Sequence, residues 1–120
     1  MARPQRSRRV CKEPVFDSFA PSDPQQHDCV SLTIDEYEVL RLVDYEKRTH
    51  EQCAAVMDIS RSTVTEIYES ARYKLADCVI NGKCLSISGG NYRLCDGSAV
   101  SYCGKDCRKA PVLSCDDRAM

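Results

Sequence analysis

The residues of this chain best suited to recognising another molecule lie between positions 61 and 66. They supply one long donor, three hydroxyl groups and one carboxylate: Arg61, Ser62, Thr63, Thr65 and Glu66. An arginine can donate to guanine or to phosphate, a threonine can touch a thymine methyl group, and a glutamate can accept from a cytosine amino group. This combination is typical of a helix that enters the major groove of duplex DNA, and a merely solvated helix face is the alternative interpretation.

Further cations lie on both sides of this segment in the sequence. Arg72 and Lys74 follow it and could hold phosphates on its flank. The first twelve residues contain no acidic side chain and carry four arginines suited to binding DNA, namely Arg3, Arg6, Arg8 and Arg9. Such an arm can follow the phosphates or enter the minor groove, and a disordered basic tail that binds without specificity is the alternative.

Cysteines form the other group with chemical potential. The chain has nine, and four of them follow residue 93 with the spacing C-x7-C-x3-C-x7-C, namely Cys95, Cys103, Cys107 and Cys115. Four thiolates could bind zinc or an iron–sulfur cluster, although only the x3 gap lies within the usual range for zinc ligands. Free thiols on a flexible tail are the alternative, and we expect Cys53 and Cys78 to be core residues instead.

The polar segment at 61–66 needs a helical pair to position it, and residues 49–74 predict one. Thr49 is a good N-cap with Gln52 three residues later, which is the pattern of a capping box. Ser60 caps the next helix, so the connection holds only Asp58 and Ile59. Asp58 tolerates the left-handed conformation that such a turn requires. Two helices joined this tightly must cross steeply, as in a helix-turn-helix, and a plain helical hairpin is the alternative.

A helix before this pair and a strand after it complete the predicted domain. Residues 32–46 read as a helix capped by Thr33 and Glu36, with a broad stripe of apolar side chains. The third helix is predicted to end at Asn81-Gly82, because glycine favours the left-handed helix end. Residues 84–88 alternate as a short strand with Leu85 and Ile87 toward the core, and its natural partner is the segment 9–11.

These elements predict a mainly α fold: a three-helix helix-turn-helix domain with a short β element and a cysteine-rich tail. The predicted divisions are a basic arm and Pro-rich linker at 1–31, the helix-turn-helix domain at 32–92, and the tail at 93–120. A chain of 120 residues suffices for one small domain with such extensions.

Composition limits the classes of function. The net charge of −1 argues against a purely electrostatic nucleic-acid binder, so the placement of the charges matters. No apolar stretch is long enough for a signal peptide or a membrane span, and we therefore expect a cytoplasmic protein without a membrane partner, in which cysteines are thiols or metal ligands rather than disulfides. No nucleophile–histidine–acid set and no Gly-rich phosphate loop is recognisable, so an enzyme is not expected.

The segment LTIDEYEVLRLVDYEKRTHEQCAAVMDISRSTVTEIYESARYKL resembles the DNA-binding region 4 of bacterial sigma factors. The shared features are a Leu-Thr-x-x-Glu opening, a Leu-Arg-Leu centre, an Ile-Ser-Arg-x-Thr-Val turn and an Ala-Arg-x-Lys-Leu close. With MARPQRSRRVC at the start and GKCLSISGGNY after the helices, residues 1–92 also resemble uncharacterised protein family 0251, or domain of unknown function 134. That family is described as predicted DNA-binding, and its members often carry a metal-site-like Cys pair where this tail has no Cys-x-x-Cys.

Two hypotheses from different classes follow. The resemblance and the polar helix imply a transcription regulator that binds duplex DNA; a homodimer would place half-sites about 34 Å apart. The alternative is a metal- or redox-responsive protein in which the tail cysteines bind zinc or an iron–sulfur cluster.

Overall fold

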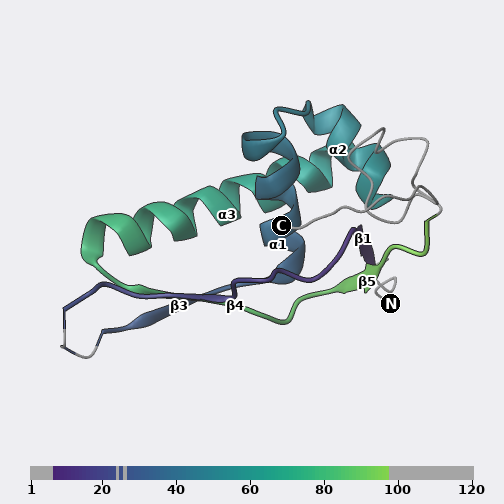
Figure 1. The fold of residues 1–120 in the computed structure, drawn as a ribbon. Coiled ribbons are helices and arrows are strands. Elements are labelled where there is room, and N and C mark those ends of the chain that lie inside the picture. The colour runs from purple at the N-terminus through teal and green to yellow at the C-terminus, as the bar shows by residue number, and fades with distance from the viewer. Residues whose placement is uncertain (1–6, 24, 26, 98–120) are drawn as a thin grey trace, which may run out of the picture.

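The computed structural model describes residues 7–23, 25 and 27–97 (Figure 1). Three α-helices and five short strands form one small mixed fold. The helical elements are α1 (Ile34–Leu40), a π-helical turn η1 (Arg41–Tyr45), α2 (His50–Met57) and α3 (Arg61–Asn81). The strands are β1 (Arg8–Val10), β2 (Ser18–Phe19), β3 (Cys29–Leu32), β4 (Cys84–Ile87) and β5 (Tyr92–Leu94).

The starts of all three helices agree with the caps predicted from the sequence. The Thr33 hydroxyl accepts from the Glu36 N–H, and the Glu36 carboxylate accepts from the Thr33 N–H at 2.9 Å. Thr49 and Gln52 form the same reciprocal pair at the start of α2. The Ser60 hydroxyl accepts from the Thr63 N–H at 3.2 Å. These side chains satisfy N–H groups that have no partner within the helix, which fixes where each helix begins.

Two left-handed residues end α2 and α3. Asp58 has φ 60° and its N–H donates to Ala54 O, so α2 stops at the short turn before Ser60. Gly82 has φ 66° and its N–H donates to Cys78 O, which ends α3 at the predicted position. A left-handed residue reverses the chain while satisfying a carbonyl of the last helical turn.

The first helical segment differs from the single helix predicted over 32–46. Regular α-helix ends at Leu40, and residues 41–45 form the wider π-helical turn, in which the Glu46 N–H donates to Arg41 O at 2.9 Å. Lys47 then takes a positive φ of 64° in the loop that leads to α2. The widened turn redirects the chain before α2 begins.

The strand pairing corrects one prediction. The N-terminal segment does not pair with residues 84–88: β1 pairs in parallel with β5, with Val10 opposite Leu94. Both sides of β4 are occupied, because β2 pairs with it antiparallel and β3 pairs with it in parallel. The region predicted as a basic arm and Pro-rich linker at 1–31 therefore supplies β1, β2 and most of β3.

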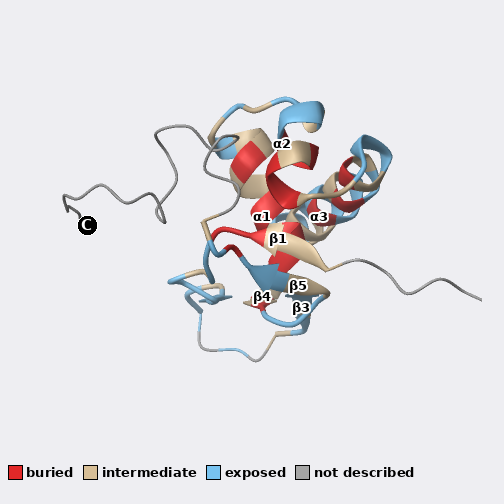
Figure 2. Ribbon diagram, turned by 90° about the vertical axis from the view of Figure 1, so that its right-hand side faces the viewer, coloured by how far each residue is buried: buried red, intermediate tan, exposed pale blue. Residues whose placement is uncertain are grey.

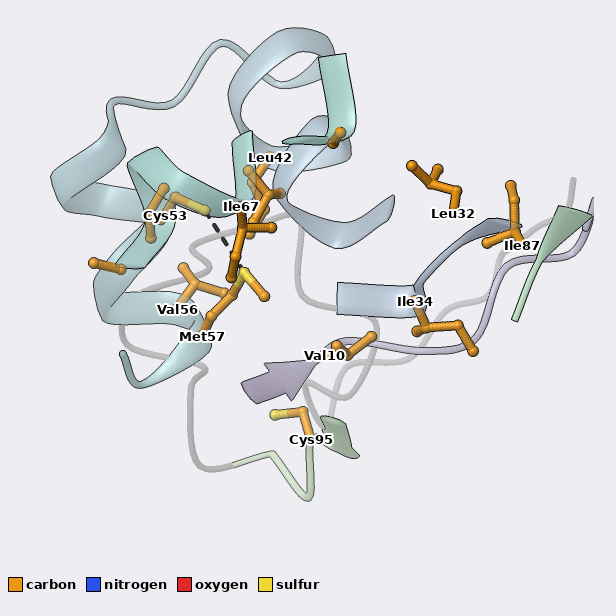
Figure 3. Packing of buried hydrophobic residues seen from close by; sticks show 14 of the residues in the cluster. Val10, Leu32, Ile34, Leu42, Cys53, Val56, Met57, Ile67, Ile87 and Cys95 are labelled. Atoms are coloured by element: carbon orange, nitrogen blue, oxygen red, sulfur yellow. Dashed lines mark hydrogen bonds between the residues drawn. The ribbon is translucent and has the colours of Figure 1, made fainter. Parts of the chain in front are cut away.

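The core lies between the helices and the two small sheets (Figures 2 and 3). Leu85 and Ile87 are buried as predicted, and so are Cys53 and Cys78. Val10 is completely buried, so the arm contributes directly to the core. None of the helices formed by the described residues has the length and apolar character needed to cross a membrane.

Candidate nucleic-acid interface

The first two turns of α3 present a polar surface on one side and a buried surface on the other. Arg61, Ser62 and Glu66 are exposed, whereas Val64 and Ile67 are buried in the core. The helix is held by its apolar face because residues three and four positions apart share one side of a helix. The polar residues predicted from the sequence are thus gathered at the solvent-facing start of α3.

The hydroxyl groups at this helix start contact one another. Ser60 Oγ lies 2.8 Å from Thr63 Oγ1 and 3.2 Å from Ser62 Oγ. Since Ser60 is the N-cap, the neighbouring hydroxyls belong to the capping arrangement as well as to the exposed surface. Thr63 is half-buried, and its side chain is therefore less available than that of Ser62.

Thr65 has an internal role that the sequence did not reveal. Its hydroxyl donates to Arg61 O at 3.2 Å and lies 2.9 Å from Nδ1 of His50, the first residue of α2. The His50 ring also packs edge-on against Tyr68, with ring centroids 4.9 Å apart. These contacts join the starts of α2 and α3, and nothing in the spacing of His50 and Thr65 indicated them.

Unlike Thr65, Arg61 and Glu66 make no side-chain contacts of this kind with other described residues. Within the ranges 7–23 and 27–97, neither side chain makes a hydrogen bond or an ion pair with another side chain or with the backbone. Their charged groups are consequently available to a molecule that approaches the start of α3. Lys47, exposed in the loop before α2, shares this property among the described residues.

The two cations farther along α3 have different surroundings. Lys74 Nζ donates to Ser31 O at 2.9 Å and to Glu36 Oε1 at 2.8 Å, so it joins α3 to β3 and α1. The Arg72 side chain is 61% exposed; it lies over the Tyr68 ring, donates to the Tyr68 hydroxyl at 3.1 Å, and its Nε lies 3.6 Å from Asp44 Oδ2. Arg72 remains accessible, whereas Lys74 is part of the packing between elements.

The two described arginines of the N-terminal arm both make contacts within the protein. Arg3 and Arg6 lie outside the described residues. Arg8 Nε lies 3.8 Å from Asp35 Oδ2, in a contact that is largely shielded from solvent. Arg9 donates to the carbonyl oxygens of Val56 at 2.8 Å and Ala55 at 3.0 Å, at the C-terminal end of α2. A cation is favourable there because helix carbonyls without partners carry partial negative charge.

A network of charged side chains before α2 was not predicted from the sequence. Glu38 is completely buried, accepts from the Cys11 N–H at 3.0 Å and pairs with Arg41 at 2.9 Å. Arg41 also contacts Glu46, which in turn pairs with Arg48 at 3.1 Å. Burial acts against the charge of Arg41, but the hydrogen bonds and attraction from Glu38 outweigh it and raise the pKa of the guanidinium. The available signal was that Glu38 lies four residues from both Ile34 and Leu42, on the apolar side of the helix.

Of the four tail cysteines, only Cys95 lies within the described residues. It is buried, and its sulfur accepts from the Gly97 N–H at 3.3 Å. Cys103, Cys107 and Cys115 fall outside the described part. Among the residues that the structure does describe, no group of three or more His, Cys, Asp or Glu side chains could hold a metal ion.

A concave feature of the described part of the chain lies away from this surface. A groove of about 600 Å³ runs between the C-terminal half of α3, the end of α1 and the β2–β4–β3 sheet. Its lining is mainly apolar and includes Phe19, Leu75 and Val79. None of the residues predicted to bind DNA lines it.

Comparison with known proteins adds a family. A family model described as "Protein of unknown function DUF134" matches residues 1–95. A "UPF0251 protein" of Desulfitobacterium hafniense (strain DSM 10664 / DCB-2) is 48% identical over 111 residues, which cover 91% of this chain and 88% of the relative. A UPF0251 protein of Methanococcus maripaludis (strain C7) is 41% identical over 110 residues, covering 88% of this chain and 85% of that one. One from Thermoanaerobacter pseudethanolicus is 43% identical over 98 residues, covering 80% and 83%. No solved structure matches the chain.

Proposed function

The chain belongs to the family described as protein of unknown function DUF134, and we propose that it binds specific sequences of duplex DNA through α3, as a transcription regulator. The α2–turn–α3 pair is the helix-turn-helix in this proposal. The resemblance to region 4 of sigma factors covers the same segment and favours the same function.

The observation that carries the proposal is the exposed start of α3. Arg61, Ser62 and Glu66 are exposed while the opposite side of the helix is buried, so this end can approach a surface of matching shape. The major groove admits an α-helix, and recognition helices use their N-terminal residues to contact base edges. A short turn with left-handed Asp58 is what separates α3 from α2 and leaves that end uncovered.

The contacts within the protein refine which side chains we assign to DNA. We assign base contacts to Arg61 and Glu66, whose charged groups have no partner among the described residues. We assign phosphate contacts to Ser62 and Arg72, with Arg3 and Arg6 of the arm as additional candidates. Ser62 and Arg72 also have contacts within the protein but are exposed. Five further residues from the sequence-based set are half-buried in addition to having internal contacts, and hold the interface in place in this proposal: Thr63, Thr65, Lys74, Arg8 and Arg9.

Selection of bound sequences from a random duplex pool tests the proposal directly. We expect one enriched sequence, whose affinity falls steeply with salt because phosphate contacts release counterions. A two-fold symmetric consensus with half-sites about one helical turn apart would identify a homodimer. Failure to enrich any sequence, together with no duplex binding at low salt, would refute the function.

Single substitutions then separate the roles. Arg61→Ala should weaken binding to the selected sequence by about 1–3 kcal/mol and leave non-specific binding less affected, since a base contact carries specificity. Arg72→Ala should weaken binding to all sequences similarly. Lys83→Ala is a matched control, because Lys83 follows the far end of α3 and pairs with Asp77. Equal loss on every sequence for Arg61→Ala would make Arg61 a phosphate contact.

A further inference from the structure

Two cysteines that are far apart in the sequence face each other where β3 and β4 begin. Cys29 and Cys84 are direct partners in the parallel ladder. Neighbouring strands lie about 4.8 Å apart, and disulfide-bonded cysteines have Cα separations of about 4.4–6.8 Å. The backbone therefore already holds the two residues at a separation that a disulfide can span.

Both side chains also lie on the same side of the sheet. The next pair along the ladder, Val30 and Leu85, belongs to the core side, and Leu85 is buried. Because side chains alternate along a strand, Cys29 and Cys84 share the opposite, outer side. Cys29 is exposed and Cys84 is half-buried, so a small reagent in solution can reach the pair.

The position of Cys84 beside Cys29 affects its acidity. A hydrogen bond with Cys29 raises the pKa of Cys84, and burial adds to this effect. Cys29 is the exposed thiol of the pair, and Cys84 lies opposite it in the ladder.

The other described cysteines are placed differently. Cys11, Cys53, Cys78 and Cys95 are all buried, and Cys78 donates through its thiol to Cys84 O at 3.5 Å. Burial raises the pKa of Cys53 to about 12, with Glu38 adding to it, so that thiol is inert at neutral pH. Over residues 7–97, apart from 24 and 26, Cys29 is the exposed cysteine, and its partner across the ladder is Cys84.

Metal binding is not the chemistry that this pair favours. A structural zinc site needs four ligands, and the described residues bring together no set of three His, Cys, Asp or Glu groups able to hold a metal ion. Two facing thiols without further ligands favour thiol–disulfide chemistry instead.

We propose that Cys29 and Cys84 are a redox modification site, which a low-molecular-weight disulfide such as oxidised glutathione converts to a disulfide bond. The Cys29 thiolate attacks one sulfur of the oxidant, forming a mixed disulfide and releasing one glutathione thiolate. Cys84 then attacks the Cys29 sulfur and releases the second glutathione. Both cysteine protons are lost to solvent or to the released thiolates, and two electrons pass from the cysteines to the oxidant.

The bond would enclose all three helices, because β3 precedes α1 and β4 follows α3. A crosslink across so long a segment restricts the unfolded chain strongly and raises the melting temperature. This inference goes beyond DNA binding and does not depend on it.

Peptide mapping of the full chain tests the site. The protein is incubated with oxidised glutathione, remaining thiols are alkylated, and trypsin digestion is followed by mass spectrometry. Cleavage after Lys12, Arg41, Lys74, Lys83 and Arg93 places Cys29, Cys78 and Cys84 in three separate peptides. We expect a linked pair formed by the peptides of Cys29 and Cys84, which dithiothreitol separates.

Matched variants and a second measurement complete the test. Cys29→Ser and Cys84→Ser should each abolish the linked pair, whereas Cys78→Ser should retain it. The oxidised wild type should melt at a higher temperature than the reduced form, with no such difference for Cys29→Ser. Stable glutathione on Cys29 without a link, a link from Cys29 to another cysteine, or equal melting temperatures in both redox states would overturn the proposal.

Discussion

Glu38 is a carboxylate at a helix position whose neighbours on the same side are apolar. It is fully buried, and two groups stabilise its charge: the Cys11 N–H and the Arg41 guanidinium. A buried charge is costly unless it is paired and hydrogen-bonded, so each partner is required for the other. Glu38 thereby links Cys11, the residue after β1, to Arg41, where α1 becomes the π-helical turn.

Glu38→Ala should therefore destabilise the protein by about 3 kcal/mol, because it leaves Arg41 with one acidic partner in place of two. Glu38→Gln should cost less, since the amide oxygen can still accept from Cys11. Urea denaturation measures both, with Glu66→Ala as an exposed control expected to change stability by no more than about 0.5 kcal/mol. Equal stability of Glu38→Ala and the control would show that the buried pair contributes nothing.

The lowered pKa of Glu36 predicts that the stability of the protein depends on pH. Burial acts to raise its pKa, but hydrogen bonds from Lys74, Ser70 and the Thr33 N–H outweigh burial, so the pKa lies below the ordinary value of 4.5. The unfolded chain then binds this proton at a higher pH than the folded protein does. The stabilisation is complete above about pH 4.5 and is lost as the pH falls through the folded pKa.

Melting temperatures of the wild type and Glu36→Gln, measured from pH 7 downward, check this dependence. The substitution should destabilise the protein at neutral pH, and the difference between the two proteins should shrink in acid, where protonation removes the contribution of the Glu36 carboxylate from the wild type. A difference that stays constant over the whole range would contradict the lowered pKa.

At the scale of elements, the turn between α2 and α3 depends on one backbone conformation. Asp58 adopts φ 60°, and its carboxylate pairs with Arg93 at 2.9 Å. Both side chains are substantially exposed, so this ion pair adds little stability. What the position requires is a residue that accepts the left-handed region, as aspartate and asparagine do better than most.

Asp58→Val should destabilise the protein by about 1–2 kcal/mol, because a β-branched side chain is strained in the left-handed region. Asp58→Asn is the matched control, since it also removes the charge opposite Arg93 but tolerates the conformation. Urea denaturation of both variants separates strain from charge. Equal losses would mean that the charge and not the backbone determines the effect.

At the scale of the whole molecule, β1 and β5 join segments from the two ends of the described chain. The Cys95 N–H donates to Val10 O at 2.7 Å, and both residues are buried. Cys95 is therefore a core residue in addition to any role as a tail ligand. The folded unit extends through β5, beyond the predicted end of the domain at residue 92.

Shortening the chain at its C-terminal end tests whether β5 is part of the folded unit. A chain that ends at Asn91 should melt at a lower temperature than one that ends at Gly97, because it lacks β5 and uncovers Val10. Circular dichroism at matched protein concentrations measures the difference. Identical melting curves would show that the pairing of β1 with β5 does not contribute to stability.

The chain ending at Gly97 is also the appropriate form for the metal hypothesis, since it retains the core and removes Cys103, Cys107 and Cys115. If these cysteines bind zinc or an iron–sulfur cluster, anaerobically purified full-length protein should contain metal that the truncated form lacks. Equal metal content in both forms would exclude the tail from metal binding.

The elements that the sequence predicted correctly are those controlled by neighbouring residues. Thr33 with Glu36, Thr49 with Gln52, and Ser60 each satisfy a helix start within three positions, and Asp58 and Gly82 end helices by their own backbone preference. The alternation at 84–88 likewise predicted which side chains of β4 are buried.

Tertiary structure alone decided the partners of residues distant in sequence. β1 pairs with β5 because β2 and β3 already occupy both sides of β4, and no local pattern records that competition. Arg9 and Lys74 read from the sequence as cations available to DNA, yet their partners are carbonyl and carboxylate groups of other elements. Caps and turns are local hydrogen-bonding choices, whereas strand partners and buried charges depend on which segments the folded chain brings together.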